Sequence, residues 1–249
     1  MNDSDGARLT GKVAIITGGA RGQGEAEARL FASHGAQVVV TDVLAEQGQA
    51  VAESLGDQAI FVQHDVSSEE GWADVIDHTL HRFGRVDVLI NNAAISKPLK
   101  LEDTTTATYR QIIDINQVGV FLGMRAVLQP MKQAGGGVII NVASVAGLQG
   151  TSTLFAYTAS KWAVRGMSKS AALELARYNI RVNVINPGVI DTPINHDNPD
   201  KMNQVLVQTT PLRRMGDPIE IAEAALFIAS DAARFATGAD FTIDGGMSI

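Results

Sequence analysis

Short runs of β-branched residues alternate with longer helical patterns along most of the chain, and this alternation constrains the fold more than any other feature. The strands are almost continuously apolar, which is typical of a parallel sheet covered by helices on both faces. We therefore predict an α/β fold, a single doubly wound domain with seven strands. Strands are predicted at 13–17, 37–41, 59–64, 86–90, 137–142, 181–185 and 240–243, and helices at 22–34, 45–55, 69–83, 105–133, 156–178 and 218–230.

Composition indicates the class of protein. Hydrophobic residues make up 45% of the 249 residues, enough for one large core. The net charge of −7 argues against nucleic acid and anionic membranes as partners, since both call for a basic face. The chain has no cysteine, which excludes disulfides, and its five histidines show no metal-ligand spacing, so no metal site is predicted. Neither a signal peptide nor a bilayer-spanning run is recognisable, and we expect a cytoplasmic protein.

Two segments do not follow the alternation of strands and helices. Residues 1–9 are predicted to be a flexible N-terminal tail that precedes a single domain at 10–249. The stretch at about 190–212 is polar and contains three prolines. A long loop in a compact domain is usually functional or mobile, and this one follows the end of a strand. We predict a substrate lid there, with a tolerated surface insertion as the alternative.

A glycine-rich turn follows the first predicted strand and opens the first helix. Glycine permits a tight turn and close approach of the backbone to a pyrophosphate, while the helix N-terminus presents unpaired N–H groups. The position between a strand and a helix makes a dinucleotide site a stronger interpretation than an ordinary turn. The predicted contacts are Gly18, Arg21, Gly22, Gln23 and Gly24.

Residues at the ends of the next strands extend the cofactor prediction. Asp42 ends the second strand, where a carboxylate can bond the ribose hydroxyls and repel a 2′-phosphate, which favours NAD over NADP. Arg21 could pair with that phosphate, and Asp42 could also be a simple helix N-cap, but we give Asp42 the greater weight as a ribose ligand. The site is predicted to continue at the ends of the third and fourth strands with Asp65, Val66, Asn92 and Ala93.

Tyr157 and Lys161 are the strongest candidates for catalysis. Because they stand four residues apart on a predicted helix, they share one face and their side chains are adjacent. A free tyrosine has a pKa of about 10, and a nearby ammonium lowers it, so Tyr157 could act as a base near neutral pH. With the glycine-rich turn, this pair indicates hydride transfer on an alcohol or ketone. Taken alone, either residue could be an ordinary residue of a helix surface.

Together these features resemble the classical short-chain dehydrogenase/reductase family from Lys12 to Gly246. The chain departs from the family pattern at Gln23, where an aliphatic residue is common, and at Ala94, where glycine is common. The resemblance implies a Rossmann-type seven-stranded parallel sheet and a homotetramer built through the two long helices and the C-terminal segment. The motifs that carry it are TGGARGQG, HDV, NNAA, Asn116 within DINQVGVF, Ser144, YTASK and PGVIDTP.

The resemblance also implies roles for individual residues. Tyr157 would exchange the hydroxyl proton, and Lys161 would lower its pKa and bond the nicotinamide ribose. Ser144 would hold the substrate oxygen, and Asn116 would anchor a water that leads protons to solvent. The nicotinamide would be held by Pro187, Gly188, Val189, Ile190 and Thr192. The predicted substrate contacts are Ser144, Val145, Ala146, Gln149 and Tyr157, with Leu148 and Phe155 beside them.

The leading hypothesis is an NAD-dependent dehydrogenase of an apolar secondary alcohol or hydroxysteroid-like substrate, because the predicted substrate space is mostly apolar. A 3-oxoacyl-carrier-protein reductase is the alternative within the family. Leu173 and the stretch 134–137 stand where such enzymes usually have basic residues, and the acidic net charge opposes docking of an acidic carrier. A non-catalytic dinucleotide-binding sensor is a third possibility, which the intact Ser144, Tyr157 and Lys161 argue against.

Overall fold

The computed structural model describes residues 8–196 and 200–249. Within these residues, seven strands form one parallel sheet in the order β3-β2-β1-β4-β5-β6-β7. The predicted α/β fold with a seven-stranded parallel sheet is confirmed. The strands are β1 (Val13–Thr17), β2 (Gln37–Asp42), β3 (Ala59–Gln63), β4 (Val88–Asn91), β5 (Gly137–Val142), β6 (Ile180–Pro187) and β7 (Asp240–Ile243).

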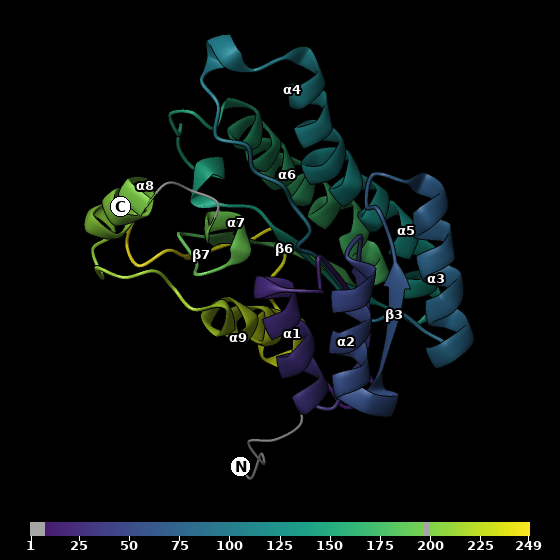
Figure 1. Cartoon of the computed structure of the whole chain (residues 1–249). Helices are drawn as coiled ribbons and strands as arrows, with labels where there is room; N and C mark the ends of the chain where they lie inside the picture. Colours follow the sequence, from purple (N-terminus) through teal and green to yellow (C-terminus); the bar gives the residue numbers. More distant parts are fainter. Residues whose placement is uncertain (1–7, 197–199) are drawn as a thin grey trace.

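Helices cover both faces of the sheet (Figure 1). Successive side chains of a strand point to opposite faces, so Ala14 and Ile16 of β1 enter one core layer and Ile15 enters the other. This burial on both faces explains the continuous apolar runs in the sequence. One layer contains α1 (Gly22–Ser33), α2 (Ala45–Leu55) and α9 (Pro218–Ala229), and the other contains α3 (Glu69–Phe83), α5 (Gly119–Gln133) and α6 (Phe155–Leu175).

The strand order changes direction at β1, and this places the functional end of the sheet. The strands β2 and β3 lie on one side of β1, and β4 to β7 lie on the other. Ligands of such sheets bind beyond the carboxyl ends of the strands at this switch point. Asn92, just after β4, ties the end of β4 to the end of β1, because its Nδ2 donates to the carbonyl oxygen of Thr17 at 2.9 Å.

The single helix predicted for 105–133 is interrupted in its middle. The helix α4 (Thr106–Ile113) passes into a π-helical turn, Asp114–Val118, before continuing as α5. The buried Asn116 lies in this turn, and its side chain bonds the backbone of Ile95. Periodicity did not predict the wider turn, although π turns are frequent at functional sites.

The segment 190–212 is largely helical, so the prediction of a loop was wrong. It contains α7 (Pro193–His196) and α8 (Asp200–Thr209). Two of its prolines occupy permitted places, because Pro193 begins α7 and Pro211 follows α8. Residues 197–199 of the predicted lid lie outside the described residues.

The start of the domain also differs from the prediction. Residues 1–7 of the predicted tail lie outside the described residues. Leu9 is buried in the core, and its N–H donates to the His34 carbonyl oxygen at 3.0 Å, so the packed domain begins before residue 10. No helix among the described residues is long and apolar enough to cross a membrane.

Candidate active site

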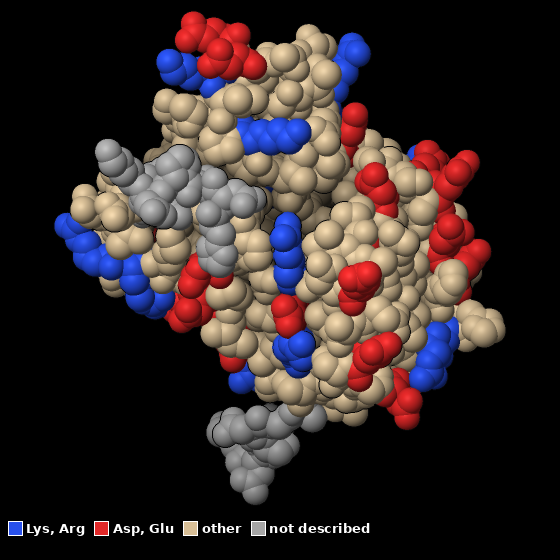
Figure 2. Space-filling model, viewed as in Figure 1, with Lys and Arg blue, Asp and Glu red and all other residues tan. Residues whose placement is uncertain are grey.

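A pocket of about 670 Å³ opens beyond the carboxyl ends of the strands. This volume lies within the usual range for cofactor and ligand sites. Figure 2 shows a hollow on this face, bordered mostly by uncharged side chains. Every predicted cofactor residue lines the pocket except Gly24, and every predicted substrate contact lines it. The structure thus brings together residues from six strand ends, and their contacts with ligands stay predictions.

The glycine-rich turn is as tight as its sequence predicts. A Cβ on Gly24 would lie 2.2 Å from the Gly18 carbonyl oxygen and 2.7 Å from Asn92 Nδ2. Gly18 has a φ of +66°, and a Cβ there would lie 2.9 Å from Ala93 Cα. Gly24 therefore belongs beneath the turn, where its lack of a side chain lets the start of α1 pack against the ends of β1 and β4.

One side chain on the wall of this turn has an unused donor. Gln23 Nε2 is buried without a hydrogen-bond partner among the described residues, although Gln23 lines the pocket. Leaving a buried amide unpaired is unfavourable, and the backbone N–H groups of the first turn of α1 have no partner within the helix. This set of donors fits the phosphate oxygens of a dinucleotide, since helix N-termini favour anions.

Asp42 is fixed at the end of β2 by the backbone. Its Oδ2 accepts a hydrogen bond from the Ala20 N–H at 3.1 Å, and its Oδ1 accepts one from the Leu44 N–H at 3.0 Å. The N-cap residue of α2 is Leu44, so the alternative interpretation of Asp42 as a helix N-cap is wrong. At the end of β3, the exposed Asp65 accepts bonds from the Ser67 N–H and hydroxyl. Both carboxylates still line the pocket.

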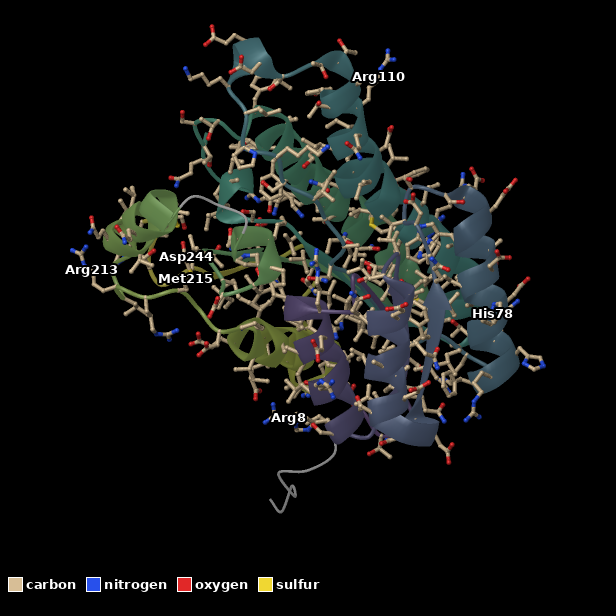
Figure 3. All side chains as sticks on the ribbon, viewed as in Figure 1. Arg8, His78, Arg110, Arg213, Met215 and Asp244 are labelled. Atoms are coloured by element: carbon tan, nitrogen blue, oxygen red, sulfur yellow. The ribbon has the colours of Figure 1, made fainter. Side chains whose placement is uncertain are left out.

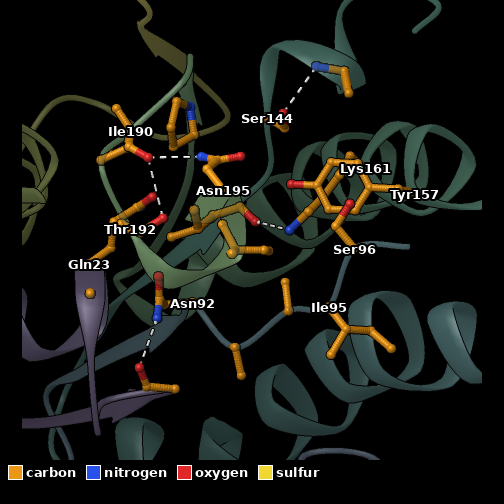
Figure 4. A pocket seen from close by; sticks show the side chains of 18 of the residues that line it. Gln23, Asn92, Ile95, Ser96, Ser144, Tyr157, Lys161, Ile190, Thr192 and Asn195 are labelled. Atoms are coloured by element: carbon orange, nitrogen blue, oxygen red, sulfur yellow. Dashed lines mark hydrogen bonds between the residues drawn. The ribbon is translucent and has the colours of Figure 1, made fainter. Parts of the chain in front are cut away.

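Tyr157, Lys161 and Ser144 face the same pocket (Figure 4). Tyr157 and Lys161 belong to the first two turns of α6, and Ser144 follows the end of β5. Lys161 is buried, and its Nζ donates to the Val142 carbonyl oxygen at 2.8 Å. The same nitrogen lies 5.4 Å from the centre of the Tyr157 ring. The three residues thus line one pocket, and their catalytic roles stay predictions.

Burial controls the protonation of this group. It raises the pKa of Tyr157, while a hydrogen bond with Ser144 acts in the opposite direction. Burial also lowers the pKa of Lys161 to about 7. Desolvation disfavours both the phenolate and the ammonium, and the sequence gives no measure of desolvation. The predicted lowering of the Tyr157 pKa by Lys161 stays a prediction.

Asn116 lies behind the pocket wall rather than on it. Its Oδ1 accepts from the Ile95 N–H and its Nδ2 donates to the Ile95 carbonyl oxygen, both at 2.9 Å. Nδ2 also lies 3.3 Å from the Ser160 hydroxyl oxygen. The side chain thus ties the segment after β4 to α6, and the predicted water contact of Asn116 stays a prediction.

The structure adds lining residues that sequence reasoning missed and removes two. Phe155 is half-exposed and lies outside the pocket, with its ring centre 6.2 Å from that of Tyr109, and Leu148 is also absent from the lining. The predicted lid contributes Pro193, Ile194, Asn195 and Leu206, which the sequence did not single out, and the C-terminal segment adds Met247. Elsewhere the additions include Val43, Leu44, His64 and Pro98.

Two of the added residues are held by local bonds. Asn195 Nδ2 donates to the Ile190 carbonyl oxygen at 2.8 Å, and Figure 4 shows its amide oxygen directed into the pocket. Met247 sits in a C-terminal turn shaped by Asp244, which is labelled in Figure 3. The Asp244 carboxylate accepts bonds from the N–H groups of Gly246 and Ser248. Neither residue belongs to one of the quoted motifs, although Asn195 stands only two residues after PGVIDTP.

Comparison with known proteins agrees with this geometry. The family model described as Enoyl-(Acyl carrier protein) reductase matches residues 18–248. The chain belongs to the short-chain dehydrogenase/reductase family. It is an oxidoreductase of the short-chain type, as the resemblance predicted.

Members of the short-chain dehydrogenase/reductase family resemble the chain over nearly its whole length. It is 45% identical over 239 residues to the 3-alpha-(or 20-beta)-hydroxysteroid dehydrogenase of Mycobacterium tuberculosis, covering 96% of this chain and 90% of that protein. It is 46% identical over 247 residues to the NADP-dependent (R)-specific alcohol dehydrogenase of Lentilactobacillus kefiri, covering 97% and 98%. The crystal structure of the 3-ketoacyl-(acyl-carrier-protein) reductase from Brucella melitensis complexed with NADH matches with a TM-score of 0.92 and 36% identity, covering 97% and 100%.

Proposed function

We propose that the protein is an NAD-dependent dehydrogenase of an apolar secondary alcohol, which also reduces the corresponding ketone. The observation that carries the proposal is the convergence of Tyr157, Lys161 and Ser144 in a pocket that also contains the glycine-rich turn and Asp42. Several apolar residues line the same pocket as the catalytic group. They are Ile95, Val145, Ala146, Val189, Leu206 and Met247. The hydroxysteroid and alcohol dehydrogenases among the relatives support the same substrate class.

Each residue has a separate task in the proposed reaction. Tyr157 takes the proton of the alcohol at its phenolic oxygen during oxidation and returns it during reduction. Ser144 donates to the substrate oxygen and stabilises the negative charge that develops there. Lys161, fixed by the Val142 carbonyl, supplies positive charge beside the Tyr157 ring when it is protonated. The bound dinucleotide supplies the atom that accepts or donates hydride.

The preference for NAD rests on Asp42. The two backbone bonds to its carboxylate hold a negative charge at the end of β2, where it would repel a 2′-phosphate. Arg21 is exposed on the pocket rim and is the residue that could favour NADP. Steady-state kinetics with both cofactors test this proposal. For Asp42→Asn we expect the preference for NAD⁺ over NADP⁺ to fall by about tenfold or more, because about 1.4 kcal/mol or more of repulsion is removed. Higher kcat/KM with NADP⁺ in the unaltered protein would contradict the proposal.

The reaction itself is tested with purified protein and a panel of alcohols and ketones. The panel contains cyclic and linear secondary alcohols of graded size, steroids and sugars, each assayed with NAD⁺ and NADP⁺. Tyr157→Phe should retain NAD⁺ binding in calorimetry and lose turnover by about 10³-fold, since it removes the proton donor and acceptor. Turnover within tenfold of the unaltered protein would exclude Tyr157 as the acid–base group. A protein that acts as a dinucleotide sensor would keep its cellular effect in this variant.

Reduction of a 3-oxoacyl group is the second candidate. The likeness to the Brucella melitensis reductase favours it. Against it, Leu173 on α6 is 84% exposed where such enzymes commonly carry a basic residue, and the net charge is −7. A 3-oxoacyl thioester assayed with and without its carrier protein distinguishes the two. Carrier-dependent turnover that exceeds turnover of every alcohol or ketone in the panel would favour this candidate.

A homotetramer is part of the proposal. Large apolar side chains are exposed on the two long helices, namely Phe121 of α5 and Trp162 and Leu173 of α6. Phe235 and Ile249 are fully exposed near the C-terminal end. Contiguous exposed apolar residues mark association surfaces. Light scattering coupled to size-exclusion chromatography measures the mass directly, and a monomer mass at micromolar concentration would contradict the proposal.

A further inference from the structure

Polar residues recur every four positions along one face of the catalytic helix. They are Tyr157, Lys161, Arg165 and Lys169 of α6. Residues at this spacing lie one above another on a helix. The first two line the pocket, whereas the last two lie outside it and contact Asp240 of β7. Because Arg165 and Lys169 lie outside the pocket, direct contact with a ligand does not explain their place in this row of polar residues.

Arg165 makes three hydrogen bonds to two different elements. Its Nε donates to Asp240 Oδ1 at 2.9 Å and its Nη2 donates to Asp240 Oδ2 at 3.1 Å. Its Nη1 donates to the carbonyl oxygen of Gly147 at 2.6 Å. The side chains of Arg165 and Asp240 are each only 19% exposed. Two parallel bonds to one carboxylate fix the plane of the guanidinium, so the third bond has a defined direction.

That third bond reaches the short turn that carries Ser144. Gly147 is the last residue of the 3₁₀ turn Val145–Gly147, and Ser144 precedes it. The Gly147 N–H donates to the Ser144 carbonyl oxygen at 2.8 Å, and the Ala146 N–H donates to Ser144 Oγ at 3.1 Å. A Cβ on Gly147 would lie 2.9 Å from the Lys161 carbonyl oxygen, so the turn packs directly on α6. Any displacement of Gly147 is thus passed to the Ser144 hydroxyl.

The Asp240 carboxylate also bonds the end of β6, a third segment that borders the site. Its carboxylate accepts a bond from Lys169 Nζ at 2.6 Å and one from Asn186 Nδ2 at 3.3 Å. Asn186 immediately precedes Pro187, which lines the pocket. Burial alone would raise the pKa of Asp240, but the bonds from Arg165, Lys169 and Asn186 outweigh it and hold the pKa well below its ordinary value. Asp240 is therefore a permanent anion between α6 and β6.

We propose that Arg165, oriented by Asp240, is a positioning residue that sets the Ser144 hydroxyl against Tyr157. It acts through the 144–147 turn, since it does not line the pocket itself. The inference rests on the proposed function, because the position of Ser144 matters only if Ser144 holds a reacting oxygen. Small misplacements of such groups reduce turnover strongly, by about 10²-fold for about 1 Å.

The chain offers a matched control for a test of this role. Arg165→Met removes the bonds to Gly147 and Asp240, whereas Lys169→Met removes a bond to the same Asp240 carboxylate without touching the turn. For Arg165→Met we expect kcat to fall by about 10- to 100-fold while KM for NAD⁺ changes by less than about twofold. For Lys169→Met we expect kcat within about twofold of the unaltered protein. Arg165→Lys should recover part of kcat, because an ammonium can bond one of the two partners.

Hydrogen exchange of peptides that contain 144–149 gives a readout independent of turnover. We expect faster exchange there in Arg165→Met than in Lys169→Met, with equal exchange in β1. If the unaltered protein turns over none of the alcohols or ketones in the panel, the proposed function fails, and exchange still decides whether Arg165 fixes the turn. If Arg165→Met does not fold, the same comparison is made with Arg165→Lys. Unchanged kcat and exchange in the Arg165 variant, or equal losses in both variants, would overturn the inference.

Discussion

The helices α1 and α6 both begin at the pocket, but they treat their buried polar side chains in opposite ways. On α6, Lys161 bonds the Val142 carbonyl oxygen, and the Ser168 hydroxyl oxygen accepts a bond from Asn141. On α1, Gln23 and Glu27 stand four residues apart. Glu27 is completely buried, and both of its carboxyl oxygens lack a hydrogen-bond partner among the described residues.

This difference follows from what each helix presents to the pocket. The start of α1 offers backbone N–H groups to a ligand, so the glycine-rich turn before it needs small residues. The buried side chains of α1 do not have to be held in one position for this task. In α6 the side chains of Tyr157 and Lys161 themselves act, and the bond to the Val142 carbonyl oxygen holds Lys161 in place. Glu27 avoids the cost of a buried charge by staying protonated, since burial raises its pKa to about 8. The contrast predicts that loss of the Lys161 side chain in α6 affects turnover, whereas changes at Gln23, Gly24 and Glu27 of α1 affect binding and stability.

The largest effect is expected on the α6 side. Lys161→Met removes the ammonium beside Tyr157 and the bond to the Val142 carbonyl. We expect turnover of the alcohol to fall by about 10³-fold, because the phenolate loses its nearby positive charge. Stopped-flow and steady-state assays measure this loss. A variant that keeps a tenth of the activity would show that burial, and not Lys161, governs Tyr157.

A methyl group at the turn should weaken binding of the dinucleotide next most strongly. In Gly24→Ala the new Cβ would lie 2.2 Å from the Gly18 carbonyl oxygen, so the turn must open. We expect about 100-fold weaker NAD⁺ binding in calorimetry, which corresponds to about 3 kcal/mol of overpacking. Gly166→Ala on α6 is the control, because its Cβ meets nothing within 4 Å. That change should add up to about 1 kcal/mol of stability and leave NAD⁺ binding unaltered. Equal losses of NAD⁺ affinity in the two variants would contradict the expectation that the start of α1, and not α6, controls NAD⁺ binding.

The two helices should also differ in the sign of their effect on stability as pH changes. Because burial raises the pKa of Glu27 from 4.5 to about 8, the stability it contributes is present below pH 4.5 and is lost as pH rises to about 8. Burial lowers the pKa of Lys161 from 10.5 to about 7, so its contribution is present above pH 10.5 and is lost as pH falls to about 7.

Glu27→Gln tests the α1 half of this statement. Between pH 4.5 and pH 7 the free energy of unfolding of the unaltered protein should fall by about 3 kcal/mol relative to the variant, which cannot ionise. Urea unfolding at a series of pH values measures the difference. Parallel pH profiles of the two proteins would mean that Glu27 has a partner when the protein is in solution.

The smallest effect is expected at Gln23. Replacement by Leu removes a buried donor that has no partner among the described residues, so the ligand-free protein should gain about 1 kcal/mol of stability. If Nε2 serves a phosphate, NAD⁺ should bind about tenfold more weakly, which is the worth of one charge-assisted bond. Thermal unfolding with and without NAD⁺ reports both changes in one experiment. Unchanged NAD⁺ affinity would assign Gln23 to the core of α1 alone.

The strands and helices were predictable because each leaves a pattern of apolar residues in its own stretch of sequence. Continuous apolar runs mark strands buried on both faces, and the seven strands and their order in the chain follow from them. The helical segment 190–212 and the π turn at 114–118 escaped prediction. At the π turn, bonds between the Asn116 side chain and the backbone of Ile95 accompany the wider turn, and no local pattern reports such bonds.

The sequence by itself determined which residues meet at the carboxyl ends of the strands, since their spacing places Gly18, Asp42 and Tyr157 at successive strand and helix ends. Only the tertiary structure decided the directions in which the pKa values of Tyr157 and Lys161 shift, because desolvation depends on everything that surrounds a group. It also brought Met247 to the pocket and Arg165 to Gly147 and Asp240. Spacing along the chain reports neighbours on one element, whereas burial and bonds between elements arise only after the chain has packed.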